Sequence, residues 1–404
     1  MELSLVAIDQ RPEVREFPRV GVGLLPVAGV FGPNASGKTN MLAALAWLRT
    51  AVMTSMRNWD ESIPVEPFAF ESASGRDSSF VLEMEVHGVR FEYLLDVGVH
   101  KVSYEALFHY PKGRRRLIFE REDKQLSLQR GLGELSGTRA LLTNRSLVLS
   151  IASRFDERYT SSFANTLRRV TSLGQPLGGR RRGMPGSWRS TLRVFEDDQD
   201  ALPFLDEQSA EDRGSRRDRA ISLLRMADLG VADVEIEEPD EGESALFQRG
   251  IQRPQLVHIV GGQRKALPYE SESSGTQAWF ELIGPVLTAL DYGSVVLFDE
   301  FDASLHPTLT AQLVKLFEEP GSNPRGAQLI FTAHDTNLLN HLNRDEVWLT
   351  DKLNGATRFA PLSDFAGERV RQSRNLETGY LSGRFGALPD VAQPEVLRSL
   401  GLIG

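Results

Sequence analysis

The chain has 404 residues, of which 41% are hydrophobic and 25% charged, so it is an ordinary globular protein with enough apolar residues for a large core and two or three domains. Its net charge of −9 gives no overall positive field that would draw it onto nucleic acid, and the absence of cysteine excludes disulfides, cysteine-ligated zinc and a thiol nucleophile. Because the sequence has no apolar run of about eighteen residues and no secretory signal at its N-terminus, we expect a cytoplasmic protein without a membrane partner.

The first hundred residues begin with strand-like and helix-like patterns. Residues 1–8 alternate between polar and apolar side chains, as a strand does, and the apolar run at 24–31 predicts a buried strand. Good helix formers at 41–53 predict a helix. Between the second strand and this helix lies G-P-N-A-S-G-K-T, which matches the phosphate-binding pattern G-x-x-x-x-G-K-[S/T]. The alternative, a glycine-rich turn before a helix, is disfavoured because spacing, strand and helix all agree.

This loop predicts nucleotide binding. Its glycines allow successive backbone N–H groups to surround phosphates, and the start of the helix adds a favourable dipole. Lys38 would reach the β- and γ-phosphates of ATP, and the Thr39 hydroxyl would bind Mg²⁺. The residues expected to contact the nucleotide are Gly32, Pro33, Asn34, Ala35, Ser36, Gly37, Lys38, Thr39 and Asn40.

The middle of the chain changes character twice. A loop is expected at 54–78, and turn-like residues then separate short alternating runs that predict an antiparallel meander at 80–86, 89–97, 101–110 and 116–121. From about 138 the pattern becomes helical and is interrupted by a glycine- and arginine-rich segment that predicts a mobile loop. Helices are expected at 141–155, 161–170 and 220–229, with that loop at 174–187. No sustained heptad repeat is present, so we expect a compact helical insertion and no long coiled coil.

An α/β pattern returns in the last third of the chain. Strands are predicted at 234–237, 256–260, 295–298, 328–332 and 346–349, and helices at 275–290, 308–317 and 336–342. The nucleotide-binding fold is therefore split. We expect a first lobe at 1–135 with the phosphate loop and meander, a mainly helical insertion at 136–235, a second lobe at 236–365 and a tail at 366–404.

Two acids end the predicted strand at 295–298. Asp299 would hold the Mg²⁺ shell, and Glu300 would orient and deprotonate the attacking water. Such pairs are common by chance, but the upstream phosphate loop favours the functional interpretation. Lys38 and Asp299 are 261 positions apart (299 − 38). A split head of this kind resembles ABC-type ATPases of the SMC and RecF kind more than compact GTPases.

Three further motifs resemble parts of ABC-type heads. The polar turn E-S-S-G-T-Q at 272–277 resembles the signature loop, with Ser273, Ser274 and Gly275 at positions that contact the nucleotide of the other subunit; the alternative is an ordinary serine N-cap. Asp302, with Ser304, lies where such heads have the dimer-facing D-loop, and His306 is either part of it or a helix cap. His334 follows a predicted strand as the γ-phosphate-sensing switch histidine does.

With these motifs, the chain resembles the RloA/AriA-like branch of ABC-type ATPases, relatives of the overcoming-lysogenization-defect ATPases. The resemblance rests on GPNASGKTN, ESSGTQ, VVLFDEFDASLHP, AQLIFTAHDTNLLN and the tail segment DEVWLTDKLNGATRF, and it covers residues 1–110 and 220–390. It implies an SMC-like α/β head and ATP-dependent dimerisation of two heads, with Glu300, His334 and Lys38 catalytic and Thr39 and Asp299 on the metal. The glutamine of the ABC Q-loop is unassigned, because the first glutamine after the phosphate loop is Gln125.

The resemblance also implies partners. Members of this branch act in bacterial anti-phage defence beside a separately encoded effector, often a Toprim nuclease. Because the chain ends soon after the head, we expect the stand-alone ATPase rather than a fused nuclease. Alternatives are a RecF-type DNA-binding clamp, through basic runs at 112–116 and 180–182, and an ATP-binding scaffold with negligible turnover. The aromatic tail at 380–386 would either pack on its own head or dock a partner.

Overall fold

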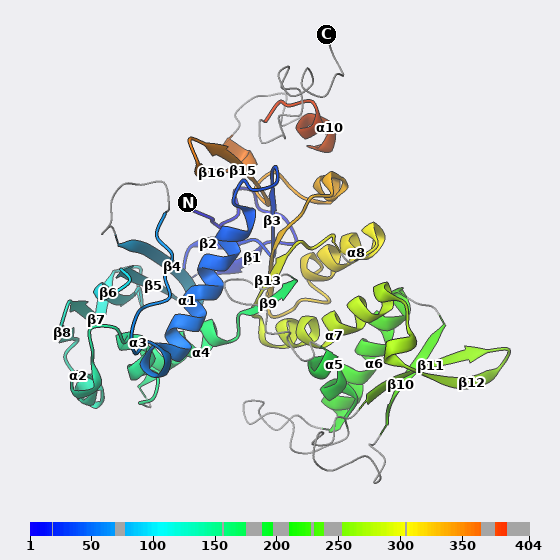
Figure 1. Ribbon diagram of the computed structural model, residues 1–404, viewed down its shortest axis with the longest axis horizontal. Coiled ribbons are helices and arrows are strands. Elements are labelled where there is room, and N and C mark those ends of the chain that lie inside the picture. The colour runs from blue at the N-terminus through cyan, green and yellow to red at the C-terminus, as the bar shows by residue number, and fades with distance from the viewer. Residues whose placement is uncertain are drawn as a thin grey trace.

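A six-stranded sheet forms the centre of the computed structural model (Figure 1), which describes residues 1–17, 19–68, 77–155, 157–174, 188–196, 210–227, 230–237, 253–303, 305–364 and 376–385. The strand order is β16-β15-β3-β14-β13-β9. Neighbouring strands pair in parallel except β15 and β16, which form an antiparallel hairpin. The strands are β3 (Val27–Phe31), β9 (Thr171–Gly174), β13 (Val295–Asp299), β14 (Gln328–Thr332), β15 (Val347–Leu353) and β16 (Ala356–Pro361).

Different elements cover the two faces of this sheet. Alternate residues of β3 enter different cores: Val27 and Phe31 face one side, whereas Ala28 and Val30 face the other. The first face packs against α5 (Trp188–Phe195), α6 (Ala210–Ala227), α7 (Ser274–Tyr292) and α8 (Pro307–Glu318). The second packs against α1 (Lys38–Asn58), α3 (Val148–Ala152), α4 (Arg158–Arg168) and the meander. Continuous apolar strands such as β3 are what a sheet covered on both faces requires.

The predicted four-stranded meander is confirmed, and a fifth strand, β8, extends it. Five strands pair in chain order through antiparallel hairpins: β4 (Ser78–Val86), β5 (Val89–Val97), β6 (Val102–His109), β7 (Arg116–Glu122) and β8 (Gln125–Leu128). One face is buried against α1 and α4, as residues of β5 such as Phe91, Tyr93 and Leu95 show. The α/β class, with a parallel core sheet beside an antiparallel lobe, follows from these pairings. No described helix exceeds the 21 residues of α1, so the described chain has no long coiled coil.

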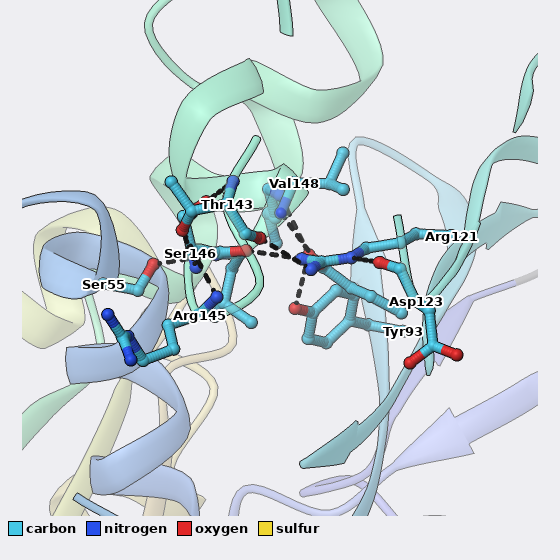
Figure 2. A network of polar contacts seen from close by, with 11 residues as sticks. Ser55, Tyr93, Arg121, Asp123, Thr143, Arg145, Ser146 and Val148 are labelled. Carbon is cyan, nitrogen blue, oxygen red and sulfur yellow. Dashed lines mark hydrogen bonds and ion pairs between the residues drawn. The ribbon is translucent and has the colours of Figure 1, made fainter. Parts of the chain in front are cut away.

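A buried ionic network joins the meander to the helices behind it (Figure 2). Arg121 of β7 is fully buried and donates hydrogen bonds to the carbonyl oxygens of Asp123, Ser146 and Thr143, at 2.6, 2.5 and 2.8 Å. Its partner Glu105 lies 3.9 Å away and accepts from Val148 N at 2.6 Å, at the start of α3. The network fixes the turn that leads into α3, which packs on α1.

The region 136–235 differs from the predicted helical insertion in containing a strand of the central sheet and in how its helices pack. It contains β9, a short strand that pairs in parallel with β13 at the edge of the central sheet. Its sequence T-S-L-G has a single large apolar residue, so periodicity gave no strand signal. Helices α5 and α6 pack on α7 rather than forming a separate unit. The other helices are α2 (Thr138–Leu141), α3 and α4, after the short 3₁₀ turn η1 (Gly133–Gly137).

Several other elements differ from their predicted form. Residues 1–8 form only an isolated bridge, Val6 to Leu24, beside a small hairpin, and the segment at 336–342 is a 3₁₀ helix. The predicted strands near 234 and 256 pair with each other, and a third strand, β12, completes a separate three-stranded sheet. These elements are β1 (Arg15–Phe17), β2 (Val22–Leu24), β10 (Val231–Glu237), β11 (Arg253–Val260), β12 (Gln263–Pro268), η2 (Tyr269–Ser271), η3 (Thr336–His341) and η4 (Leu362–Asp364).

The last described segment packs on the chain itself. Helix α10 (Leu376–Leu381) lies against η3, and the two carboxylate oxygens of Glu377 accept from Thr336 Oγ1 at 2.9 Å and Asn340 Nδ2 at 2.8 Å. Tyr380 and Phe385 are both buried and belong to the core on the first face of the central sheet. These contacts favour packing on the chain's own head over docking of a partner by the aromatic tail. In the described part of the chain, no helix combines the length and apolarity needed to cross a membrane.

Candidate active site

The phosphate loop connects β3 to α1 as predicted. Ala35, Gly32 and Gly37 have positive φ angles of 61°, 152° and 102°, a conformation in which glycine is favoured because it has no Cβ. Gly37 is the residue before the helix, and Lys38 begins it. The backbone therefore curls at the helix start, where N–H groups without helical partners are available to an anion.

Lys38 lies inside this loop. Its Nζ donates hydrogen bonds to the carbonyl oxygens of Gly32 at 2.8 Å and Pro33 at 3.1 Å. Burial lowers the pKa of Lys38, and the nearby carboxylates of Asp302, Asp299 and Glu300 act in the opposite direction. The three acids, which are far from Lys38 in the sequence, thus all raise the pKa of its ammonium group. To bind a phosphate, Lys38 would have to exchange these two carbonyl partners for phosphate oxygens.

The β15–β16 hairpin forms one wall of the loop, which the sequence did not predict. The hydroxyl of Ser36 contacts Thr350 Oγ1 at 2.5 Å, and a Cβ added to Gly32 would clash with Thr350. A Cβ added to Gly37 would clash with Thr357 Oγ1. Ser36, buried with its hydroxyl turned toward β15, would contact a nucleotide through its backbone. Asn34, Ala35, Thr39 and Asn40 are exposed on the other side.

Asp299, at the end of β13, meets Thr39 at the start of α1. Thr39 Oγ1 lies 3.1 Å from both carboxylate oxygens of Asp299, although the two residues are 260 positions apart. Asp299 is buried and Thr39 is exposed, so the pair lies at the edge of the site rather than within the core. Oxygen ligands of this kind suit Mg²⁺, which is bound by one or two protein groups together with water and substrate phosphates.

Thr332, at the end of β14, contacts both acids. Its Oγ1 donates to Asp299 Oδ1 at 2.7 Å and accepts from Glu300 N at 2.8 Å. Glu300 has a φ of 54°, a left-handed conformation that costs a residue with a Cβ about 1–2 kcal/mol. Its half-buried side chain leaves the strand end there, next to Asp299. Thr332 could not be predicted from sequence, since a threonine two residues before the predicted switch histidine matches no motif.

Asp302 and His334 are in direct contact through the backbone of the switch segment. Asp302 Oδ2 accepts hydrogen bonds from His334 N at 2.9 Å and Asp335 N at 2.5 Å. Asp302 Oδ1 is buried and has no hydrogen-bond partner, and the His334 side chain is exposed. The sequence predicted Asp302 as a contact across the dimer; within one chain it also anchors the switch histidine. Ser304 lies outside the described residues.

The predicted signature loop lies at the start of α7. Ser273 is the N-cap: its Oγ accepts from Thr276 N at 3.1 Å, so the capping alternative describes its contact within the chain. Ser273 and Ser274 are exposed, and a Cβ at Gly275 would meet nothing nearer than Ser273 Oγ at 3.9 Å. Helix α7 covers the opposite face of the sheet from α1 (Figure 1). The signature loop is thus an open helix start in a layer separate from the phosphate loop.

The remaining predicted features have modest roles in this chain. His306 caps α8, since its Nδ1 accepts from Thr308 N at 3.3 Å. In the basic run at the β6–β7 turn, Arg115 pairs with Glu92 at 2.8 Å and stacks over the Phe108 ring. The run at 180–182 lies outside the described residues. Gln125, the first glutamine after the phosphate loop, lies in β8 and leaves the Q-loop unassigned.

The residues present fit Mg²⁺ and a nucleoside triphosphate. The loop glycines allow the phosphate loop to lie close against the β15–β16 hairpin, where a Cβ at Gly32 or Gly37 would clash with Thr350 or Thr357. Lys38 supplies a buried cation, and Thr39 and Asp299 supply adjacent oxygens. No cluster of three or more histidines or acids that could hold a metal by itself occurs among the described residues. A cation here would therefore depend on the nucleotide for further ligands.

One family model and several solved structures are similar to this chain. The family described as "AAA domain, putative AbiEii toxin, Type IV TA system" matches residues 27–340, whereas a search of curated proteins finds no match. Among solved structures, the SMC head domain from Thermotoga maritima is 12% identical over 82% of this chain and 89% of that one, with a TM-score of 0.38.

Two other solved structures are similar. An SMC head domain with an extended coiled coil from Pyrococcus furiosus, bound to the C-terminal domain of ScpA, is 13% identical over 85% of this chain and 92% of that one, with a TM-score of 0.38. A dimeric ATP-binding cassette in a post-hydrolysis state with bound ADP and phosphate is 12% identical over 83% and 85%, with a TM-score of 0.32. These TM-scores are low, so the assignment rests on the sequence match. Because that match spans more than half of the chain, the protein belongs to the AAA domain family described as putative AbiEii toxin of type IV toxin–antitoxin systems, a family of P-loop ATPases.

Proposed function

We propose that this chain hydrolyses ATP at a site that two copies of the chain complete together. The observation that carries the proposal is the convergence of Lys38, Thr39, Asp299 and Glu300 at the carboxyl ends of β3 and β13. The carboxyl ends of parallel strands are where α/β proteins place their ligands. The helix start at Lys38 adds the anion-binding backbone that phosphates require.

Each residue has a role that its position supports. Lys38 and the loop N–H groups hold the phosphates, and Thr39 and Asp299 would hold Mg²⁺, which would neutralise charge on the phosphate oxygens. Glu300 takes a proton from the attacking water as the water oxygen bonds to the γ-phosphorus and the bond from that phosphorus to the β–γ bridging oxygen breaks, so that ADP leaves. His334, exposed beyond the end of β14, contacts the transferred phosphoryl group.

Dimerisation is part of the proposal because the signature loop is unused within the chain. Ser273 and Ser274 are exposed and Gly275 is half-buried at a helix start, in a layer separate from the phosphate loop of their own chain. A second copy would bring these groups onto the nucleotide held by the first. Asp302, whose Oδ1 has no partner in the single chain, would lie at the same boundary.

The biological role follows from family membership and from the resemblance to the RloA/AriA-like branch. The family description refers to type IV toxin–antitoxin systems. We therefore propose that ATP binding and hydrolysis assemble or remodel a bacterial anti-phage defence complex with a separately encoded effector, such as a Toprim nuclease. Sequencing of neighbouring genes tests this part: a toxin-like or Toprim frame supports it, and repair genes favour a DNA-binding clamp instead.

The Glu300→Gln variant tests the catalytic proposal. It keeps the shape of the side chain but removes the base, so we expect phosphate release to fall by about 10²-fold or more while ATP remains bound and holds a dimer. Glu319→Gln, an exposed acid after α8, is the matched control and keeps the wild-type rate. Phosphate release at the wild-type rate by Glu300→Gln would refute the mechanism. Negligible release by the wild type would instead favour a scaffold.

A further inference from the structure

One buried hydroxyl connects the two strand ends that carry the catalytic groups. Thr332 is 1% exposed, and its Oγ1 uses both of its hydrogen-bonding functions: it donates to Asp299 Oδ1 at 2.7 Å and accepts from Glu300 N at 2.8 Å. A hydroxyl has one proton to donate, so these two bonds fix the direction of that proton. The Thr332 side chain therefore joins the carboxylate of Asp299, the acid proposed to bind the metal, to the backbone N–H of Glu300.

The backbone of Thr332 adds a second attachment to the same turn. Its carbonyl oxygen accepts from Phe301 N at 2.9 Å. Two successive N–H groups after β13, those of Glu300 and Phe301, are thus held by one residue of β14. Phe301 is itself fully buried, so the turn is fixed on both sides of Glu300.

This fixing matters because Glu300 has an unfavourable backbone conformation. With φ at 54°, the residue lies in the left-handed region, where a glutamate persists only when its surroundings hold it. The direction in which the Glu300 side chain leaves the backbone depends on that φ. Without the Thr332 acceptor, the Glu300 N–H loses its partner and the turn is free to relax toward an ordinary conformation.

We propose that Thr332 is a positioning residue that aims the Glu300 carboxylate at the attacking water by holding Glu300 N–H and Asp299 with one hydroxyl. The inference rests on the proposed function, in which Glu300 is the base. Thr332 is also the last residue of β14, and His334 follows two residues later. Thr332 thus fixes the position of the carboxyl end of β13 relative to the carboxyl end of β14.

The test compares three variants by steady-state phosphate release at saturating Mg²⁺. Thr332→Val keeps the shape and removes the hydroxyl, and we expect kcat to fall by about 10- to 100-fold, since a general base contributes about 10²- to 10⁴-fold and misplacement forfeits part of that. The KM for ATP changes by less than about threefold. Thr332→Ser restores the hydroxyl and returns kcat to within about threefold of wild type.

Thr191→Val is the matched control. Thr191 is fully buried and its hydroxyl also makes two bonds, donating to Phe280 O at 2.6 Å and accepting from Gly284 N at 2.9 Å, between α5 and α7. A drop in kcat for Thr191→Val equal to that for Thr332→Val would indicate general loosening and overturn the inference. Binding of a fluorescent ADP analogue and thermal melting confirm that each variant is folded.

A double-mutant cycle with Glu300→Gln separates positioning from other effects. If Thr332 acts through Glu300, Thr332→Val lowers the residual single-turnover rate of Glu300→Gln by less than about twofold. An unchanged kcat in Thr332→Val, no rescue by Thr332→Ser, or full additivity with Glu300→Gln overturns the inference while leaving the ATPase proposal intact. A wild-type rate in Glu300→Gln overturns both.

Discussion

Removing Arg121 tests whether the attraction between Arg121 and Glu105 stabilises the buried network of Figure 2. In Arg121→Met, three carbonyl oxygens lose their donor, and the Glu105 carboxylate loses the only cation within 4.0 Å among the described ion pairs. Loss of one partner from a buried ion pair costs about 3–5 kcal/mol, because it leaves an uncompensated charge. We expect the free energy of unfolding to fall by that amount at pH 8. Arg139→Met, in which an exposed arginine loses one bond to Leu126 O, is the control, with an expected change below about 0.5 kcal/mol.

The pH dependence of this loss is the sharper measurement. Burial raises the pKa of Glu105, and Arg121 opposes that rise together with the N–H groups of Leu149 and Val148. In Arg121→Met the folded-state pKa of Glu105 rises further above its unfolded value. Such a group stabilises fully below the unfolded pKa and loses that contribution as the pH rises through the folded pKa.

The destabilisation by Arg121→Met is therefore largest at pH 8 and shrinks toward pH 5, where Glu105 takes up a proton. Urea unfolding followed by tryptophan fluorescence at both pH values measures it. A loss that is the same at pH 5 and pH 8 would mean that the carbonyl hydrogen bonds, and not the charge of Glu105, carry the cost. A loss below about 1 kcal/mol at pH 8 would refute the reasoning altogether.

Two further predictions address the phosphate loop and a buried imidazole. Gly37→Ala places a side chain at φ 102° against Thr357, so nucleotide affinity should fall by more than about tenfold by titration calorimetry. Gly113→Ala has a comparable φ of 70° in open space and should leave affinity unchanged; equal affinity in both variants would contradict the role of the hairpin. His109 is buried without a hydrogen-bond partner, and burial lowers its pKa, so its stabilising contribution is present above the unfolded pKa and is lost as the pH falls through the folded one. His109→Phe should therefore raise the melting temperature more at pH 5 than at pH 7.5, and an equal change at both would show that His109 does not titrate.

The sequence predicted the parts of this site that lie in continuous motifs. The phosphate loop, the strand end at Asp299 and the histidine after β14 have local patterns, and the structure places the first two within hydrogen-bonding distance. Four strands of the meander were also predictable, because the three turns between them contain glycine or proline; β8 follows a turn, Asp123-Lys124, that contains neither. The two halves of the fold could be recognised in the sequence because each has its own motif, the phosphate loop in the first and the acidic strand end at Asp299 in the second.

The contacts that shape the site were not predictable, because they join positions far apart in the chain. Thr350 lies 314 residues after Ser36, and a lone threonine in a strand has no motif. Strand β9 is too short and polar to show a period, and its place beside β13 comes from pairing with the sheet edge. Tertiary context overrides local propensity most strongly in such short segments.

Mixing two inactive variants tests most directly whether two chains complete one site. Lys38→Ala removes the phosphate-binding ammonium, and Ser273→Arg blocks the exposed signature loop. Each protein alone should release phosphate at less than about 1% of the wild-type rate, as expected when a group essential to the transition state is lost. In a mixed dimer one site has both an intact Lys38 and an intact Ser273, so an equimolar mixture should recover up to roughly a quarter of the wild-type rate by statistical pairing. A mixture no more active than its two components would contradict completion of the site between chains.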